Sequence, residues 1–304
     1  MSLESVQVGI VGNGFVGKAT RLMAAERADG DICVKTIVYD KSSVLCSPGG
    51  TTMADIATCD IVFVCVPTPM KRDGECDTSI VEQVVDEIMD IRPFAPIVVR
   101  STVPPGTCSR LGVSFMPEFL TEKNWARDVA ECREWILGVD DVGRDNGIVE
   151  RLSLILNSSK KAGYVSSTSV VETNPTTAEM IKYGRNCFLA TKVAFFNEIY
   201  EVCESVGCEF EKVRKGICAD ERVGESHSHV PGHDGKRGFG GTCLPKDLSA
   251  LAYVAFVRGV HCPVLDSVQL RNNALDRPEK DWMQDVGRAV VGTRIAGTHC
   301  REEK

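Results

Sequence analysis

The sequence predicts an α/β protein of two domains, with a doubly wound parallel sheet over residues 1–175 and an all-helical domain with a long central helix over residues 176–304. Three observations support this prediction. A glycine-rich turn separates the first apolar strand pattern from the first helical pattern. Short apolar segments then alternate with helical ones, as in sheets whose strands are joined by crossover helices. From Thr177 the strand patterns stop, and one helical pattern runs to Ser205.

Length and composition limit the class of protein. A chain of 304 residues is long enough for roughly two domains, and its net charge of −7 excludes a global basic field that would recruit nucleic acid. No apolar run reaches the ~18 residues of a membrane span, and residues 1–5 lack the basic and apolar regions of a secretory signal. The 14 cysteines include no C-x-x-C pair. We therefore expect a cytoplasmic protein with free thiols and no membrane partner.

The first predicted strand, residues 6–11, leads directly into the pattern G-x-G-x-x-G and then into a predicted helix over residues 18–27. This is the context that a dinucleotide-binding turn requires. The first glycine allows the turn, the second lets backbone approach a pyrophosphate, and the third lets the helix pack on the strand. Helix N–H groups then bind the phosphates. We expect a Rossmann-like cofactor site formed by Gly12, Gly14, Phe15, Val16 and Gly17.

A carboxylate ends the second predicted strand, residues 34–39. Asp40 lies 23 residues after Gly17, close to the spacing of about 20 expected for an acid that binds the ribose 2′-hydroxyl. Because a carboxylate at this position repels a 2′-phosphate, the sequence favours NAD over NADP as the cofactor.

Further strands are predicted at residues 61–66, 97–102, 113–116, 135–138 and 164–165, with a crossover helix over residues 79–91. Ligands of open α/β sheets lie beyond the carboxyl ends of the strands. We therefore expect Pro67, Thr68 and Thr102 to border the cofactor. Glu118 and Glu122 follow a strand end, so they either face the same cleft or lie at the solvated start of a helix.

The helical pattern over residues 177–205 places Lys182 and Asn186 four residues apart on one face. An ammonium beside an amide suits a developing oxyanion, although a solvated lysine is the simpler explanation of the spacing alone. Apolar side chains such as Phe188 and Phe196 extend beyond one narrow stripe. This width predicts a helix that packs on several sides and forms a homodimer interface.

The glycine-rich segment 238–247 precedes another predicted helix, in which Pro245 suits the first position. Cys243 is therefore expected just before a helix N-terminus, where the helix dipole favours a thiolate. Lys246 adds positive charge, and Asp247 can order a proton or a water. A buried structural cysteine is the alternative, but these neighbours together favour a positioned nucleophile.

The second half also offers groups for an anionic substrate. Arg222, Lys236 and Arg237 are its local basic residues. The histidines at positions 227, 229 and 233 invite a metal site, but no cysteine or carboxylate completes a recognisable ligand spacing, so we expect no metal. Two more helices are predicted, over residues 264–275 and 279–290, before a C-terminal tail.

Seven separated motifs occur in one order along the chain. They are Gly12-Asn13-Gly14-Phe15-Val16-Gly17, Val66-Pro67-Thr68-Pro69, Asp77, Ser101-Thr102-Val103-Pro104-Pro105-Gly106-Thr107, Pro117-Glu118-Phe119-Leu120-Thr121-Glu122, Lys182 with Asn186, and residues 238–247. In this order they resemble the UDP-glucose/GDP-mannose dehydrogenase family over about residues 6–275. The resemblance implies oxidation of a nucleotide-sugar 6-hydroxyl to a carboxylate by two NAD and one cysteine. Members usually continue into a third, nucleotide-binding domain, which we expect this chain to lack.

The resemblance also implies roles for the reacting groups. Thr102 and Asp247 would manage the proton of the hydroxyl through water, and Lys182 and Asn186 would stabilise the oxyanion. Cys243 would capture the aldehyde as a thiohemiacetal, which a second oxidation turns into a thioester.

The remaining roles concern hydrolysis and binding. Glu122 would act as base in thioester hydrolysis, with Glu118 nearby, and Lys246 would join the cofactor contacts. The substrate contacts implied are Glu118, Phe119, Leu120, Lys182, Asn186, Phe239 and Gly240, together with Arg222 reaching the substrate of a neighbouring subunit.

Alternatives stay open for the substrate and for the function class. UDP-glucose is the expected substrate, and GDP-mannose or UDP-N-acetylmannosamine are alternatives. A two-electron hydroxyacid or 6-phosphogluconate-type dehydrogenase would share the cofactor half and the lysine but would need no cysteine. A non-catalytic NAD-binding module would bind the cofactor without turnover.

Overall fold

The computed structural model describes residues 4–29, 32–141 and 146–292. The chain divides into two compact units, one comprising residues 1–68 and 78–188 and the other residues 69–77 and 189–304. The domain limit predicted at residue 175 stays a prediction. Within the part of the chain that the structure describes, no helix is long and apolar enough to cross a membrane.

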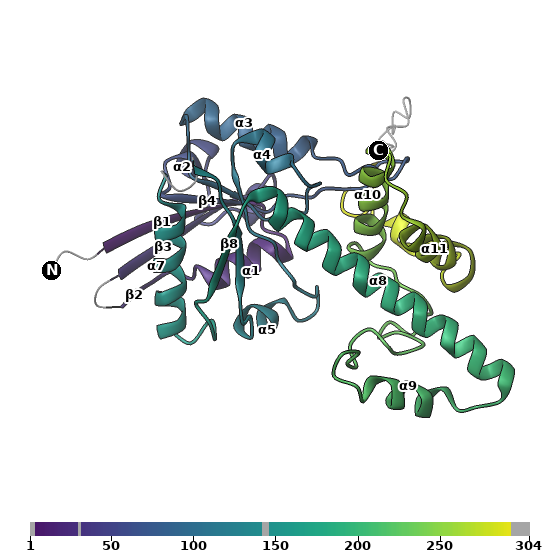
Figure 1. Ribbon diagram of the computed structural model, residues 1–304. Coiled ribbons are helices and arrows are strands. Elements are labelled where there is room, and N and C mark those ends of the chain that lie inside the picture. Colours follow the sequence, from purple (N-terminus) through teal and green to yellow (C-terminus); the bar gives the residue numbers. More distant parts are fainter. Residues whose placement is uncertain (1–3, 30–31, 142–145, 293–304) are drawn as a thin grey trace, which may run out of the picture. The chain divides into compact units, whose positions relative to one another are not determined.

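The first unit is built on one eight-stranded sheet, in the order β2-β3-β1-β4-β5-β6-β7-β8 (Figure 1). Its strands are β1 (Glu4–Val11), β2 (Arg27–Asp29), β3 (Ile32–Tyr39), β4 (Ile61–Val64), β5 (Ile97–Val99), β6 (Ser114–Phe115), β7 (Trp135–Gly138) and β8 (Val170–Thr173). Neighbouring strands are parallel, except for β2 against β3 and β6 against β7. The mainly parallel sheet confirms the predicted fold class, and the two antiparallel pairs are departures from it.

Helices cover both faces of this sheet. They are α1 (Phe15–Met23), α2 (Met53–Ala57), α3 (Ser79–Ile91), α4 (Thr107–Leu111), α5 (Trp125–Ala130) and α7 (Ile148–Lys161), with the short turn η1 (Ser43–Leu45). One apolar cluster joins the sheet to α1, α5 and α7, and a second joins it to α2, α3 and α4. Strand β4 contributes to both clusters, because its side chains alternate between the two faces of the sheet. Ile61 and Phe63 lie in the first cluster, and Val62 and Val64 lie in the second. The sheet is therefore doubly wound, as predicted.

The long helix α8 (Pro175–Val206) confirms the helix predicted over residues 177–205 (Figure 1). The second unit continues with α9 (Phe210–Cys218), α10 (Leu244–Val257), α11 (Pro263–Arg271), the π turn η2 (Asn272–Asp276) and the turn η3 (Asp281–Gln284). Phe196 and Cys203 of α8 pack with Phe210 and Cys218 of α9. Among its described residues this unit contains helices and isolated bridges, which confirms its all-helical class.

Two elements of the first unit differ from prediction. Helix α1 begins at Phe15 rather than at residue 18 and ends at Met23, because the chain from Arg27 pairs antiparallel with β3. The strand predicted at residues 164–165 is wrong. Gly163 turns the chain there with a φ of +78°, and the strand that follows is β8.

The helix predicted over residues 279–290 is also wrong, apart from η3. Lys280 and Gly287 adopt left-handed backbone angles, with φ of 46° and 84°, and a helix cannot continue through such residues. Instead, the segment returns to the loop 69–77. The Met70 N–H donates to the Ala289 carbonyl, and the Val291 N–H donates to the Met70 carbonyl.

Candidate active site

The glycine-rich turn has three glycines with different surroundings. Gly12 has a φ of +95°, and a Cβ there would lie 2.6 Å from the Cys65 carbonyl oxygen. A Cβ on Gly17 would overlap the Gly12 carbonyl. A Cβ on Gly14, in contrast, would meet nothing within 4 Å. The protein backbone therefore requires the first and third glycines, whereas the second leaves open space of the kind that a pyrophosphate needs.

Helix α1 begins beside this open space. Gly14 is its N-cap residue, and no side chain in the described part of the chain caps it. The N–H groups at the start of α1 are thus available to an anion, which fits a dinucleotide phosphate. Phe15 and Val16 begin this helix, and their backbone contact with the cofactor stays a prediction.

Asp40 lies next to the same turn. Its carboxylate accepts a hydrogen bond from the Asn13 N–H at 2.8 Å and from the Ser42 N–H at 2.9 Å. The Asn13 side chain donates to the Leu45 carbonyl at 2.7 Å. Sequence spacing predicted the carboxylate but gave no sign of these contacts. The turn and the acid are held together, which fits an adenosine ribose at this position.

Loops at the ends of β4 and β5 are linked to each other. The Ser101 hydroxyl donates to the Val66 carbonyl at 2.7 Å, and Thr68 and Thr102 are both buried. Pro67 is exposed. The two loops therefore form one border beyond the strand ends, where ligands of such sheets bind.

Lys182 and Glu118 form a buried ion pair. The Lys182 ammonium donates to a Glu118 carboxylate oxygen and to the Glu118 carbonyl, both at 2.6 Å. The other carboxylate oxygen accepts from the Leu120 N–H at 2.8 Å. The Phe119 ring lies under the Arg185 guanidinium at 3.9 Å from its centroid. The predicted lysine is thus buried rather than solvated, and it contacts the first of the two predicted glutamates, while Glu122 is exposed.

Helix α8 carries a buried polar face around Lys182. Asn186 lies one turn after it and is buried, and Glu179 lies one turn before it. Glu179 accepts hydrogen bonds from the N–H groups of Gly106 at 2.5 Å and Cys108 at 2.8 Å. Burial raises the pKa of Glu179. The sequence analysis missed this residue, although its spacing from Lys182 could have indicated it.

Cys243 is the N-cap residue of α10, as predicted. The residue is partly buried, and its sulfur lies 3.7 Å from the Thr242 hydroxyl. Lys246 donates to the buried Asp247 carboxylate at 2.5 Å. Burial alone would lower the pKa of Lys246, but Asp247, Cys76 and Cys243 around it raise that pKa above its usual value. An ammonium therefore lies near the thiol, paired with the Asp247 carboxylate.

The predicted basic residues are engaged in local ion pairs. Arg222 is exposed and binds Asp220 at 2.5 Å, while Lys236 binds Asp281 at 2.9 Å. Lys192, which the sequence analysis missed, donates to the carbonyls of residues 223 and 224 at 2.7 and 2.9 Å. This contact fixes the loop that carries Arg222.

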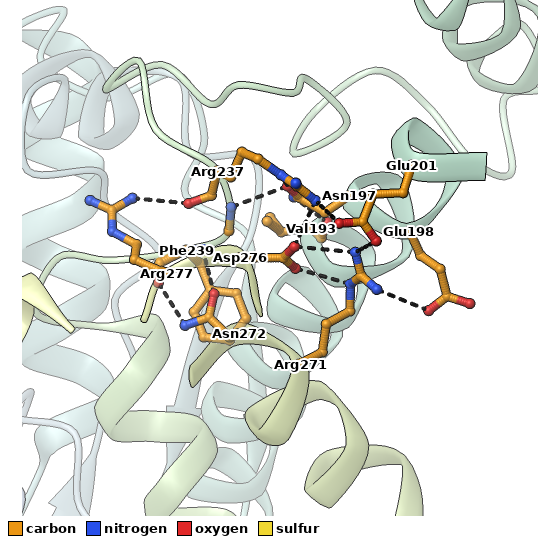
Figure 2. Close-up of polar contacts among 11 residues, drawn as sticks. Val193, Asn197, Glu198, Glu201, Arg237, Phe239, Arg271, Asn272, Asp276 and Arg277 are labelled. Atoms are coloured by element: carbon orange, nitrogen blue, oxygen red, sulfur yellow. Dashed lines mark hydrogen bonds and ion pairs between the residues drawn. The ribbon is translucent and has the colours of Figure 1, made fainter. Parts of the chain in front are cut away.

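Phe239 and Gly240, the last predicted substrate contacts, lie in the loop before Cys243. Phe239 is buried, and Asn272 binds both of its main-chain groups (Figure 2). No group of three or more histidine, cysteine or acidic side chains lies close enough to hold a metal ion among the residues that the structure describes. Cys243 lies in the second unit and Lys182 in the first. That the two side chains act on the same substrate therefore stays a prediction.

Comparison with protein families gives two matches. Residues 49–153 match the NAD binding domain of the UDP-glucose/GDP-mannose dehydrogenase family, and residues 176–274 match its central domain. Curated relatives agree. The UDP-glucose 6-dehydrogenase of Rickettsia bellii is 34% identical over 236 residues, which are 74% of this chain and 51% of that protein. That of Rhizobium meliloti is 34% identical over 257 residues, which are 79% of this chain and 56% of that protein.

Solved structures share the fold. A UDP-glucose dehydrogenase from Pyrobaculum islandicum superimposes with a TM-score of 0.75 at 23% identity, over 89% of this chain and 68% of that one. The GDP-mannose dehydrogenase from Pseudomonas aeruginosa gives 0.58 at 27% identity, over 88% and 68%. This chain spans about half the length of the curated relatives that it matches. The chain belongs to the UDP-glucose/GDP-mannose dehydrogenase family, and its cofactor is NAD.

Proposed function

We propose that the protein oxidises the 6-hydroxyl of a nucleotide sugar to a carboxylate, with UDP-glucose as the first candidate substrate. The observation that carries this proposal is Cys243, a partly buried thiol at the N-terminus of α10 beside the Lys246 ammonium. An aldehyde can be held and oxidised further through a covalent acyl intermediate, and a thiolate is suited to form one. Two-electron oxidation alone would need no such sulfur.

The first oxidation depends on stabilising an alkoxide. NAD, when bound, accepts one hydride in each of the two oxidations. Asp247 and Thr102 take the hydroxyl proton through water, and Lys182 with Asn186 stabilises the negative oxygen that remains. Both of the latter groups lie on one face of α8, and burial strengthens their electrostatic effect.

Cys243 then retains the half-oxidised sugar. Its thiolate adds to the aldehyde carbon, and the resulting oxyanion is protonated to give a thiohemiacetal. Loss of a hydride and a proton gives a thioester. Water adds to the thioester carbon, the C–S bond breaks, and the acid and the thiolate are released. Glu122 is the carboxylate proposed to take the proton of this water, because the Glu118 carboxylate already binds the Lys182 ammonium.

NADH formation from a panel of nucleotide sugars tests the proposal. We expect two NADH per sugar with UDP-glucose, and lower rates with GDP-mannose and UDP-N-acetylmannosamine. Cys243→Ser should lose acid formation, whereas Cys208→Ser, at an exposed cysteine, should behave like wild type. One NADH per sugar in wild type would indicate a two-electron dehydrogenase. NAD binding without turnover would indicate a binding module.

We also propose a homodimer through α8. Its exposed apolar side chains Ile181, Phe188, Phe195 and Val202 recur every seven residues, so they form one stripe along the helix. A stripe of this kind is suited to a second copy of the same helix. Light scattering should give twice the chain mass, and Phe188→Ser should shift the equilibrium to monomer. A wild-type monomer with full turnover would contradict this proposal.

A further inference from the structure

The loop that precedes Cys243 is held by the segment that follows α11. This segment is the π turn η2, which is closed by a hydrogen bond from the Arg277 N–H to the Asn272 carbonyl at 2.8 Å. Figure 2 shows Asn272, Asp276 and Arg277 pointing toward the loop residues Arg237 and Phe239. Such π turns are uncommon and are frequently found at functional sites.

Asn272 makes the central contact. Its side-chain oxygen accepts from the Phe239 N–H at 2.8 Å, and its side-chain nitrogen donates to the Phe239 carbonyl at 3.0 Å. Asn272 and Phe239 are both buried. One amide therefore satisfies both main-chain groups of one loop residue, in the way that a neighbouring β-strand would.

This contact sets requirements on the glycines beside Phe239. Gly238 has a φ of +64°, and a Cβ there would overlap the Asn272 side-chain oxygen. A Cβ on Gly240 would lie 2.6 Å from the Arg277 guanidinium carbon. Only residues without a Cβ allow the Asn272 side chain and Arg277 to approach the loop this closely.

Ion pairs hold both ends of this arrangement. Arg237 binds Asp276 at 2.9 Å and Glu201 of α8 at 2.8 Å. Arg277 binds Asp281 through two hydrogen bonds of 2.9 and 2.6 Å. The loop from residue 237 to 240 is thus fixed on its main chain by Asn272 and on its side chain by Asp276, just ahead of the cysteine.

We propose that Asn272 is a positioning residue that fixes Phe239, and through it the backbone leading to Cys243, for attack on the aldehyde. The proposal rests on the proposed function. Displacement of a reacting group by about 1 Å can cost about 100-fold in rate. A loop with three glycines in four residues would otherwise be free to make such a displacement.

Asn272→Asp tests this with a minimal change. The carboxylate can still accept from the Phe239 N–H, but its second oxygen faces the Phe239 carbonyl without a hydrogen. We expect kcat to fall by about 10- to 100-fold with KM changed less than about threefold. The NADH yield should fall from two toward one per sugar, because the aldehyde escapes before capture. Asn273→Asp makes the same change at the next, partly exposed residue and is the control.

A second measurement does not depend on turnover. Iodoacetamide alkylates thiolates, and peptide mass spectrometry gives the rate at Cys243 relative to the exposed Cys208. We expect this ratio to change at least about fivefold in Asn272→Asp and to stay constant in Asn273→Asp. Absence of turnover in wild type would refute the proposed function, while the alkylation ratio would still test the role of Asn272.

Asn272→Ser is the second variant, since its shorter hydroxyl cannot bind both Phe239 groups and adds no charge. Wild-type kcat, NADH yield and alkylation ratio in both folded variants would overturn the proposal. Loss of the folded circular dichroism spectrum in both variants would overturn it as well, because Asn272 would then be needed for folding rather than for positioning.

Discussion

Glu118→Gln is expected to lower the free energy of unfolding by about 3 kcal/mol, because it leaves the Lys182 ammonium buried without its counter-charge. The two charged atoms are 2.6 Å apart, and neither side chain is more than 5% exposed. The substituted amide keeps the shape of the carboxylate and can still accept one hydrogen bond. The loss therefore measures mainly the missing charge rather than a packing defect.

A double-mutant cycle separates the interaction energy between Lys182 and Glu118 from the interactions that each residue makes with its other neighbours. Lys182→Met should also cost about 3 kcal/mol, since it leaves Glu118 charged and buried. Removing both charges should cost only about 2 kcal/mol, which gives a coupling energy of about 4 kcal/mol. Urea unfolding at pH 7, followed by circular dichroism, measures all four proteins.

The exposed pair Lys71–Glu75 is the matched control. Its charged atoms are 2.7 Å apart, but its side chains are 42% and 37% exposed. Solvent screening should limit its coupling energy to about 0.5 kcal/mol. If the cycle at Lys182 and Glu118 gave a coupling as small as this control, burial would not strengthen the pair. The assignment of Lys182 as a strong electrostatic group would then fail.

Three further predictions follow from single residues. Gly12→Ala should destabilise the protein by about 2 kcal/mol, through strain and the clash with Cys65, whereas Gly14→Ala should leave Tm unchanged and lower NAD affinity in calorimetry. Asp281→Asn should cost about 1–2 kcal/mol at pH 7, because the hydrogen bond from Arg277 lowers the pKa of Asp281 to about 2. That difference should vanish in urea titrations as the pH falls from about 4 to 2. Burial raises the pKa of Glu179, so wild type should lose stability as the pH rises above 4.5, and Glu179→Gln should flatten this part of the pH profile.

Each of these predictions has a contradicting result. Equal Tm values for the two glycine variants would mean that the turn relaxes around a Cβ. A pH-independent cost of Asp281→Asn would mean that packing rather than charge sets its effect. A steeper pH profile in Glu179→Gln would mean that the carboxylate is stabilised by its backbone donors more than it is destabilised by burial.

Local sequence patterns correctly predicted those helices and strands whose limits depend on nearby residues. The helix α3 and the strand β7 have the predicted limits, because their apolar spacing and their bounding residues agree. The segment 279–290 has a helical pattern as well, yet it forms only η3. Its C-terminal end, at Ala289 and Val291, hydrogen-bonds to Met70, about 220 residues earlier in the chain, and no local pattern reports such a contact.

The candidate site was predicted as a set of residues but not as a set of contacts. Lys182 and Glu118 were both candidates, but their pairing across 64 positions was not foreseen. Asn272 lies within the helix predicted over residues 264–275, and the sequence pattern assigned it no role. A polar amide at such a position is usually solvated, and only the loop 33 residues earlier reveals its role.

Both units contain buried polar groups. Glu179, Lys182 and Asn186 line one face of α8 in the first unit, and Asn272 and Asp276 lie buried in the second. Such groups contribute less to stability than their number of contacts implies, because desolvation offsets much of the gain from a buried ion pair. Residues that cost stability without a packing benefit are those expected to position or stabilise a reacting group. The Asn272 variants test this reasoning in the second unit, because a loss of kcat in a protein that stays folded cannot be explained by a change in stability.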